Sequence, residues 1–234
     1  MAEGLSSLRA ALSGARRVHG TFVKLPSVEV VEIASATLDF AVVDLEHSQL
    51  SEADALRLVH HGWALSFPVL ARLHACDGGL VNRLLEAGAA GIQLSSVRSS
   101  ADVRALRDAS LYAPEGSRSV SLAHSAARFG ATPLADYVHA SAPPVLVIQL
   151  ETADTDDPLD EILAAGADVA FIGVTDLTVD LGFDAARVAA RVDELALAAS
   201  QAGVVLGGFG TDERFAYAIE SSDLALLRSA YARG

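Results

Sequence analysis

Val145-Leu-Val-Ile-Gln-Leu-Glu151 and Val169-Ala-Phe-Ile-Gly-Val-Thr-Asp176 are the two segments that decide the fold. Each is an apolar run, rich in β-branched residues, that ends in a carboxylate. Such a run is typical of a strand that is buried on both faces of a parallel sheet. Residues 152–175 have room for one loop, one helix and a second loop. We therefore expect two neighbouring parallel strands whose terminal acids lie side by side.

The two terminal acids, Glu151 and Asp176, are candidate metal ligands. A carboxylate at the end of a buried strand needs a partner, because burying an unpaired charge is costly. Two adjacent carboxylates repel each other, and a hard divalent cation removes that repulsion. The alternative is that each acid only caps the helix that follows it.

The same alternation of strand and helix patterns runs through the rest of the chain. We expect strands at residues 20–25, 40–46, 68–73, 91–95, 145–150, 169–174, 204–207 and 224–227. We expect helices at residues 5–17, 27–36, 51–61, 80–87, 100–109, 158–165, 184–202 and 212–220. The connection 112–144 is rich in proline and glycine and holds one further helix near residues 134–139. A connection of this length in a compact domain is usually functional.

Eight strand–helix alternations predict a (β/α)8 TIM barrel that occupies residues 1–234 as one domain. No Gly-x-Gly-x-x-Gly motif follows the first strand, so a dinucleotide-binding fold has no support. The helix at 5–17, with Leu5, Leu8 and Leu12 on one side, is expected to plug the barrel bottom. Too few residues follow the strand at 224–227 for a full final helix, so the C-terminal helix is predicted to be truncated. We expect a second copy to cover the apolar gap, which makes the protein a homo-oligomer.

Composition narrows the class of protein. The 234 residues carry a formal net charge of −13, which argues against binding to nucleic acid or to an anionic membrane through a basic surface. The single cysteine, Cys76, allows no internal disulfide and fits a reducing compartment. The N-terminus does not read as a signal peptide, and no apolar run reaches the length of a membrane span. We expect a cytoplasmic protein whose partners are small molecules.

Side chains that can take part in catalysis follow the carboxyl ends of the predicted strands. The opposite strand ends carry no such side chains. In a barrel of this type the active site lies where the strands end. The polar side chains at these ends are Asp44, Glu46, His47, Arg72, His74, Ser95, Ser96, Gln149, Glu151, Thr175 and Asp176. Their convergence on one rim predicts an active site there.

The residue types on this rim suit enolate chemistry. A divalent ion held by two carboxylates keeps most of its coordination sphere free for a 2-oxo acid, whose carbonyl it would polarise. His47 has the pKa range of a base, and Arg72 offers a planar fork to a carboxylate or oxyanion. Lys24, the only lysine, is the one candidate for a Schiff base. Structural alternatives stay open: His47 could be structural, and Arg72 could serve only Glu46 or Glu86.

Five segments together resemble the HpcH/HpaI aldolase/citrate lyase family, which contains class II metal-dependent pyruvate aldolases. They are Leu25-Pro-Ser27, Val43-Asp-Leu-Glu-His47, Leu70-Ala-Arg72, Ile148-Gln-Leu-Glu151 and Phe171-Ile-Gly-Val-Thr-Asp-Leu177. The resemblance implies a (β/α)8 barrel and a divalent ion, which is Mg²⁺, Mn²⁺ or Co²⁺. It also implies reversible cleavage of a 4-hydroxy-2-oxo acid to pyruvate, or a related 2-oxo acid, and an aldehyde.

The resemblance assigns roles by position. Glu151 and Asp176 match the metal ligands, His47 the catalytic base, and Arg72 the residue that binds pyruvate and its enolate. Gln149 matches a residue that lines the site. Glu86 falls where the family has an acid that orients the histidine.

This sequence also departs from the family pattern. The family's Pro-x-Gly-x-Arg-Gly loop reads Pro114-Glu-Gly-Ser-Arg-Ser119 here, and Val174-Thr175 replace a Pro-x pair. Ser95 and Ser96 stand where Pro-Met is common, and we expect them to contact the substrate together with Thr175. The same enolate chemistry would also serve a lyase acting on a CoA thioester or an oxaloacetate decarboxylase. A non-catalytic relative that binds a keto acid is the alternative outside enzymes.

Overall fold

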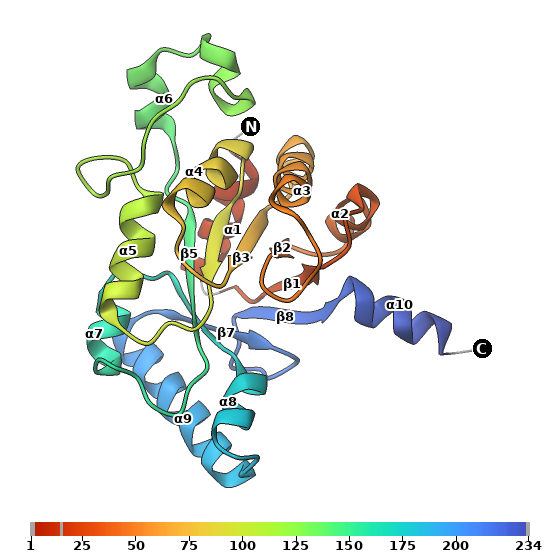
Figure 1. Ribbon diagram of the computed structural model, residues 1–234, viewed down its shortest axis with the longest axis vertical. Helices are drawn as coiled ribbons and strands as arrows, with labels where there is room; N and C mark the ends of the chain where they lie inside the picture. Colours follow the sequence, from red (N-terminus) through yellow and green to blue (C-terminus); the bar gives the residue numbers. More distant parts are fainter. Residues whose placement is uncertain (1–2, 15, 233–234) are drawn as a thin grey trace.

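The computed structural model describes residues 3–14 and 16–232, and of residues 3–7 it describes the backbone alone. Eight parallel strands close into a barrel in sequence order, and β8 pairs with β1 (Figure 1). The strands are β1 (Val18–Val23), β2 (Phe40–Asp44), β3 (Val69–Leu73), β4 (Gly91–Leu94), β5 (Val145–Leu150), β6 (Val169–Ile172), β7 (Val205–Phe209) and β8 (Tyr217–Ser222). The predicted (β/α)8 barrel is confirmed.

Helices surround the barrel and connect most of its strands (Figure 1). They are α1 (Glu3–Ser13), α2 (Val28–Ser35), α3 (Glu52–Ala64), α4 (Gly78–Ala87), α5 (Ser100–Ser110), the 3-10 helix η1 (Ser125–Gly130), α6 (Leu134–Ala140), α7 (Leu159–Ala164), α8 (Val174–Asp180), α9 (Ala185–Ala202) and α10 (Asp223–Tyr231). Local sequence sets several of their ends. Ser51 and Ser99 begin α3 and α5 with capping boxes, and Gly88 and Gly203 end α4 and α9 in the left-handed conformation.

Two apolar layers hold the barrel together. Outward-facing strand side chains, such as Ile148, pack against buried helix residues such as Leu58 and Leu84. The barrel interior is filled by a second cluster in which the rings of Phe40 and Tyr217 stack 4.3 Å apart. Such interlocking of large side chains makes the barrel a packed core and leaves the chemistry to its ends.

Helix α1 closes the end of the barrel where the strands begin. Leu8 and Leu12 belong to the interior cluster, so they plug the barrel as expected. Arg9 donates to both carboxylate oxygens of Asp168 at 2.7 Å and to the Pro144 carbonyl oxygen at 2.6 Å. The side chain of Leu5, which was expected on the same face, lies outside the described residues.

The long connection 112–144 lies at this same end, because it leads directly into β5. It contains η1 and α6, which extend away from the barrel in Figure 1. The helix expected near residues 134–139 is present as α6. Between this segment and α3 and α4 lies a cavity of about 250 Å³, lined among others by Trp63, Arg118 and Tyr137. The connection is therefore remote from the carboxyl ends of the strands within one chain.

The C-terminal part differs from the sequence-based prediction. The helix predicted at 212–220 and the strand predicted at 224–227 are wrong: strand β8 spans Tyr217–Ser222 and helix α10 follows it. Tyr217, Ala218 and Ile219 are fully buried, and they fill the core from strand β8. The Ser222 side chain accepts a hydrogen bond from the Ala225 backbone N–H at 3.2 Å, so it caps the start of α10. Leucine and alanine then favour a helix.

Helix α10 is short and extends away from the barrel (Figure 1). Its main contacts are with β8 and β1. Leu224, Leu226 and Leu227 are 46%, 58% and 43% exposed, and Tyr231 is 84% exposed. Most of the apolar surface of this helix therefore has no partner among the described residues of the chain.

Candidate active site

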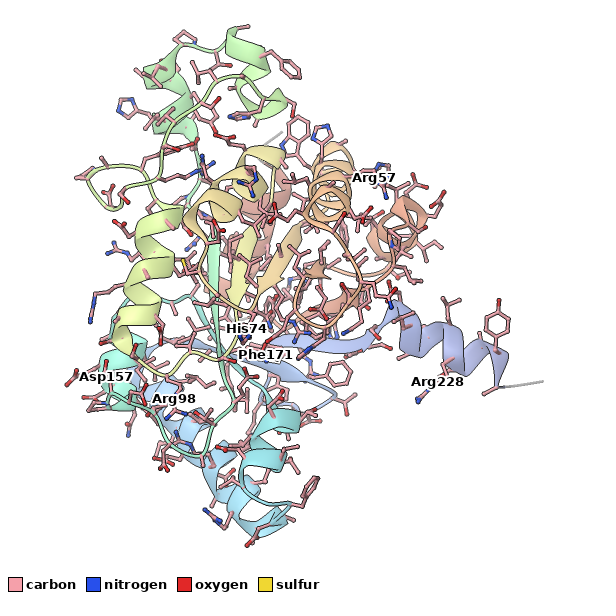
Figure 2. The ribbon with its side chains drawn as sticks, in the orientation of Figure 1. Arg57, His74, Arg98, Asp157, Phe171 and Arg228 are labelled. Atoms are coloured by element: carbon pink, nitrogen blue, oxygen red, sulfur yellow. The ribbon has the colours of Figure 1, made fainter. Side chains whose placement is uncertain are left out.

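Six polar side chains are buried at the carboxyl ends of strands β2 to β5. They are Asp44, Arg72, Gln93, Ser95, Gln149 and Glu151, all less than 7% exposed. Figure 2 labels His74, the residue after Leu73 of β3, and Phe171 of β6, both near the centre of this view. Parallel pairing in register brings these residues together from segments that are far apart in sequence, since Asp44 pairs with Arg72 and Arg72 with Gln93.

Arg72 is held by a bidentate ion pair with Asp44. Its Nε donates to Asp44 Oδ1 at 2.9 Å, and its Nη2 donates to Oδ2 at 2.6 Å. The guanidinium lies over the ring of Phe22, 4.4 Å from its centroid, and 3.4 Å separate Nε from Glu46 Oε2. The planar fork is thus fixed on three sides, as a binder of a carboxylate or oxyanion requires. Of the structural partners expected for Arg72, Glu46 is present and Glu86 is not.

Asp44 is fully buried and ionised. Burial alone would raise its pKa, but the hydrogen bonds and charge of Arg72 and the hydrogen bond from Lys24 hold the pKa well below the ordinary 3.8. The backbone N–H groups of Glu46 and His47 also donate to its Oδ1, at 3.1 and 3.0 Å. Asp44 therefore organises both Arg72 and the segment that follows β2.

Glu46 is the second acid on β2's side of the site. Its Oε1 accepts from the Ser95 hydroxyl at 2.6 Å and lies 3.2 Å from His74 Nδ1. Its Oε2 is buried without a hydrogen-bond partner among the described residues. His47 extends to solvent with a 57% exposed side chain, and its Nε2 lies 3.8 Å from Glu46 Oε2. The geometry leaves His47 free to meet a bound molecule.

Glu151 lies at the centre of a hydrogen-bonded network on β4 and β5. Its Oε1 accepts from the backbone N–H and the hydroxyl of Ser96 at 2.7 and 3.0 Å, and its Oε2 accepts from Gln149 Nε2. Gln93 Nε2 in turn donates to Gln149 Oε1 at 2.9 Å. Ser96 has a φ of 54°, a left-handed conformation that is uncommon outside glycine and often marks functional sites.

Asp176 is carried by a different kind of element than expected. Strand β6 ends at Ile172, and Thr175 and Asp176 are exposed in the first turn of α8, a helix that the sequence pattern did not predict. Gly173 joins the two, and a Cβ there would lie only 2.5 Å from Glu151 Oε2. This close approach brings the start of α8 against Glu151.

The acids of this rim fit a divalent cation. Neither Glu151 nor Asp176 forms an ion pair within the described part of the chain, and Glu151 Oε2 keeps a free lone pair. The four carboxylates, Asp44, Glu46, Glu151 and Asp176, carry four negative charges against two positive charges on Arg72 and Lys24. The difference of two is the charge of one Mg²⁺ or Mn²⁺ ion, and oxygen ligands suit such ions. Within residues 3–14 and 16–232, no group of three or more His, Cys, Asp or Glu residues is arranged to enclose a metal.

Glu86 does not join the site within one chain. It lies in the last turn of α4, a helix of ten residues that starts after β3 and ends before β4. That places it about 12 Å along the helix from Gly78, towards the opposite end of the barrel. Glu86 Oε1 accepts from Asn82 Nδ2 at 3.3 Å, and Arg118 Nε donates to Asn82 Oδ1 at 2.9 Å. The expected contact of Glu86 with His47 is therefore absent within the chain.

Lys24 and Gln93 are the site residues that sequence reasoning undervalued. Lys24 Nζ lies 2.5 Å from Asp44 Oδ2 and donates to the His47 carbonyl oxygen at 3.0 Å, so it is a bound cation and not a free amine for a Schiff base. Gln93 precedes Ser95 by two positions, so in an extended chain both side chains point to the same side, a spacing that could have identified Gln93.

Comparisons with known proteins show which family and which structures this chain is similar to. The sequence model described as HpcH/HpaI aldolase/citrate lyase matches residues 19–221. A hydroxypyruvate/pyruvate aldolase of Rhizorhabdus wittichii is 31% identical, over 95% of this chain and 91% of its own. A 4-hydroxy-4-methyl-2-oxoglutarate aldolase of Hapsidospora irregularis is 33% identical, over 76% of this chain and 69% of its own. The crystal structure of an HpcH/HpaI aldolase from Desulfitobacterium hafniense superimposes with a TM-score of 0.88 at 28% identity, covering 97% of this chain and 94% of that one.

Proposed function

Because this chain belongs to the HpcH/HpaI aldolase/citrate lyase family, we propose that it is a divalent-metal-dependent aldolase. It would reversibly cleave a 4-hydroxy-2-oxo acid to pyruvate, or a related 2-oxo acid, and an aldehyde. The names of the relatives support a 2-oxo acid as the shared substrate class. The observation that carries the proposal is one rim that holds a fixed guanidinium, Arg72, and two acids without cationic partners among the described residues, Glu151 and Asp176.

Glu151 and Asp176 would hold the ion, which is Mg²⁺, Mn²⁺ or Co²⁺. When bound, the ion would supply Lewis acidity to the carbonyl of the 2-oxo acid. Ser96 and Gln149 would keep the Glu151 carboxylate in one orientation through the hydrogen bonds they already donate. Ser95 would hold Glu46 in the same way.

Arg72 would bind the carboxylate of the 2-oxo acid or the enolate oxygen that forms next to it. Its bidentate pair with Asp44 fixes the guanidinium before the substrate arrives, so little reorganisation is needed as negative charge develops. Thr175 and the Ser95–Ser96 pair would line the remaining space around the substrate. Their hydroxyl groups suit hydrogen bonds to a hydroxylated acid or aldehyde.

His47 would act as the base that takes a proton from the carbon next to the keto group, and would return a proton in the reverse direction. Its exposed imidazole is free to reach a substrate, and histidine is the side chain most often used as a general base. Glu86 can orient a histidine only in a neighbouring copy, because it lies far from His47 in its own chain. Its proposed role therefore depends on the assembly.

We propose a homo-oligomer in which a neighbouring copy covers the apolar surface of α10. Three leucines and Tyr231 of this helix are at least 43% exposed, and an exposed apolar patch of this kind marks an interface. The described residues contain no helix that is both long and apolar enough to cross a membrane. Together with the single cysteine, this supports the proposed cytoplasmic location.

The proposal is tested by deuterium exchange at the methyl group of pyruvate, followed by NMR, with and without Mn²⁺. We expect metal-dependent exchange in the wild type and in Arg83→Gln, which removes only an exposed ion pair with Glu52. A screen of aldehydes with pyruvate and Mn²⁺, read by mass, would then identify the second substrate. Absence of exchange under all metals, with the protein folded, would refute the aldolase assignment.

A further inference from the structure

Lys24 is fixed at the rim by its backbone and by its side chain. It directly follows β1, and the backbone N–H groups of Lys24 and Leu25 donate to Asp223 Oδ2 at 2.8 and 2.9 Å. Asp223 is itself buried at the start of α10. The Lys24 side chain, 18% exposed, then reaches Asp44 and the carbonyl oxygen of His47. A long, flexible side chain is thus held at its root and at its tip.

We propose that Lys24 is a positioning residue for 2-oxo acid binding: its ammonium bridges Asp44 and the main chain at His47. The inference rests on the proposed aldolase function. Lys24 would do two things. It would keep part of the Arg72 charge available to an anionic substrate, and it would fix the segment that carries the base.

The charge effect follows from the contacts of Arg72. Arg72 is ion-paired with Asp44 and lies 3.4 Å from Glu46, so two carboxylates face one guanidinium. Lys24 brings this group of four side chains to neutrality, with two carboxylates and two cations. Without Lys24 the group would carry one net negative charge, beside the further carboxylate of Glu151. A 2-oxo acid, which is an anion, would then meet a repulsive field at its own binding residue.

The positioning effect follows from the second hydrogen bond. The His47 carbonyl oxygen accepts from Lys24 Nζ at 3.0 Å, and the His47 backbone N–H donates to Asp44 Oδ1 at 3.0 Å. Both sides of the His47 main chain are therefore tied to the Lys24–Asp44 pair. Since the imidazole itself is 57% exposed, the backbone is what limits its position. Loss of the ammonium would remove one of the two ties.

The same contacts separate this role from covalent catalysis. A Schiff-base lysine needs a free amine with open access, and Lys24 Nζ instead donates to two oxygens inside the rim. Borohydride added with pyruvate should therefore leave no reduced adduct on Lys24. An adduct on Lys24, detected by mass, would overturn the positioning role.

The test compares Lys24→Met, Lys24→Gln and Lys24→Arg with the wild type and with Arg83→Gln, in the presence of Mn²⁺. The measurements are kcat and KM for pyruvate in deuterium exchange, with folding checked by circular dichroism. We expect Lys24→Met to raise the KM for pyruvate about tenfold or more, the range of a lost charge-assisted hydrogen bond. Lys24→Gln, which can donate but carries no charge, should raise KM nearly as much. Lys24→Arg should restore most of the affinity, and Arg83→Gln should match the wild type.

The outcomes distinguish this inference from the function on which it rests. If the wild type exchanges deuterium while both neutral variants match it in KM and kcat, the Lys24 role is refuted and the aldolase proposal stands. If Lys24→Arg binds pyruvate as poorly as Lys24→Met although both are folded, the charge argument is refuted. A wild type without exchange refutes the aldolase proposal and this inference with it. Should Lys24→Met fail to fold, Lys24→Gln takes its place in each comparison.

Discussion

Replacement of Asp44 by asparagine is the most demanding test of how this site is built. Asp44 is fully buried and accepts hydrogen bonds from Arg72 Nε and Nη2, from Lys24 Nζ, and from the backbone N–H groups of Glu46 and His47. Asp44→Asn keeps the size of the side chain but removes its charge. It also replaces one acceptor oxygen with an NH₂ donor, which would face cationic donors.

The expected loss of stability is large because the variant removes the bidentate counter-charge of a buried guanidinium and leaves only Glu46, 3.4 Å from Arg72 Nε. Breaking one partner of a buried ion pair costs about 3–5 kcal/mol. Lys24 is partly exposed and can turn to solvent, so the cost comes mainly from Arg72, whose side chain is 7% exposed. For a chain of this size, each kcal/mol lowers Tm by roughly 2–4 °C. We therefore expect a decrease in Tm of roughly 6–20 °C.

Urea unfolding followed by circular dichroism measures this loss, with Asp156→Asn as the matched control. Asp156 pairs with Arg98 at the surface, and its side chain is 61% exposed, so its variant should change stability little. If Asp44→Asn loses no more stability than this control, the proposed organising role of Asp44 is wrong.

The effect should also depend on pH in a defined direction. The pKa of Asp44 in the folded state is held below its ordinary value of 3.8 by Arg72 and Lys24, against the opposing effect of burial. A depressed pKa means that the stabilisation is fully present above about pH 4 and is lost progressively as pH falls below it. The stability difference between the wild type and Asp44→Asn should therefore shrink below about pH 4. A difference that stays constant down to pH 2 would contradict the ion-pair explanation.

Three further predictions address the metal, the base and the assembly. Glu151→Gln and Asp176→Asn should each abolish both the deuterium exchange of pyruvate and the thermal stabilisation by Mn²⁺. A Mn²⁺-induced Tm shift that persists in both variants would refute the proposed metal site. His47→Ala should slow deuterium exchange of pyruvate about a hundredfold and leave the Mn²⁺-induced shift nearly intact, whereas exchange at the wild-type rate would exclude His47 as the base. Leu226→Glu, at a position 58% exposed on α10, should lower the mass seen by light scattering, and an unchanged mass would show that this face is no interface.

Local patterns in the sequence were enough to predict the barrel and the polar residues at the carboxyl ends of its strands. The apolar runs and the cap residues are local signals, and α3, α4, α5 and α9 begin and end within two residues of their predicted bounds in most cases. The polar residues expected at the strand ends are also found there: Asp44, Arg72, Gln149 and Glu151 are all buried at the carboxyl ends. Because all eight strands point the same way, residues at their carboxyl ends all lie on one rim of the barrel.

Local patterns failed where two assignments had similar propensities. Residues 212–227 contain apolar residues throughout, and only packing selects Tyr217–Ser222 as the strand that closes the barrel against β1. Asp176 looked like a strand-end residue, but Gly173 ends β6 early and α8 begins at Val174. For Asp176, the sequence identified the residue but not the element that carries it.

The sequence by itself therefore determined the alternation of strands and helices and the acids, guanidinium and imidazole of the rim, since these depend on periodicity and residue type. Only the tertiary structure determined which of these side chains contact each other. It separated Glu86 from His47, because a helix of ten residues carries its last turn to the other end of the barrel. It joined Lys24, which directly follows β1, to Asp44 of β2 and Arg72 of β3, because these three neighbouring strands pair in register. Contacts between distant segments depend on register and on helix direction, and neither is encoded in any single stretch of the chain.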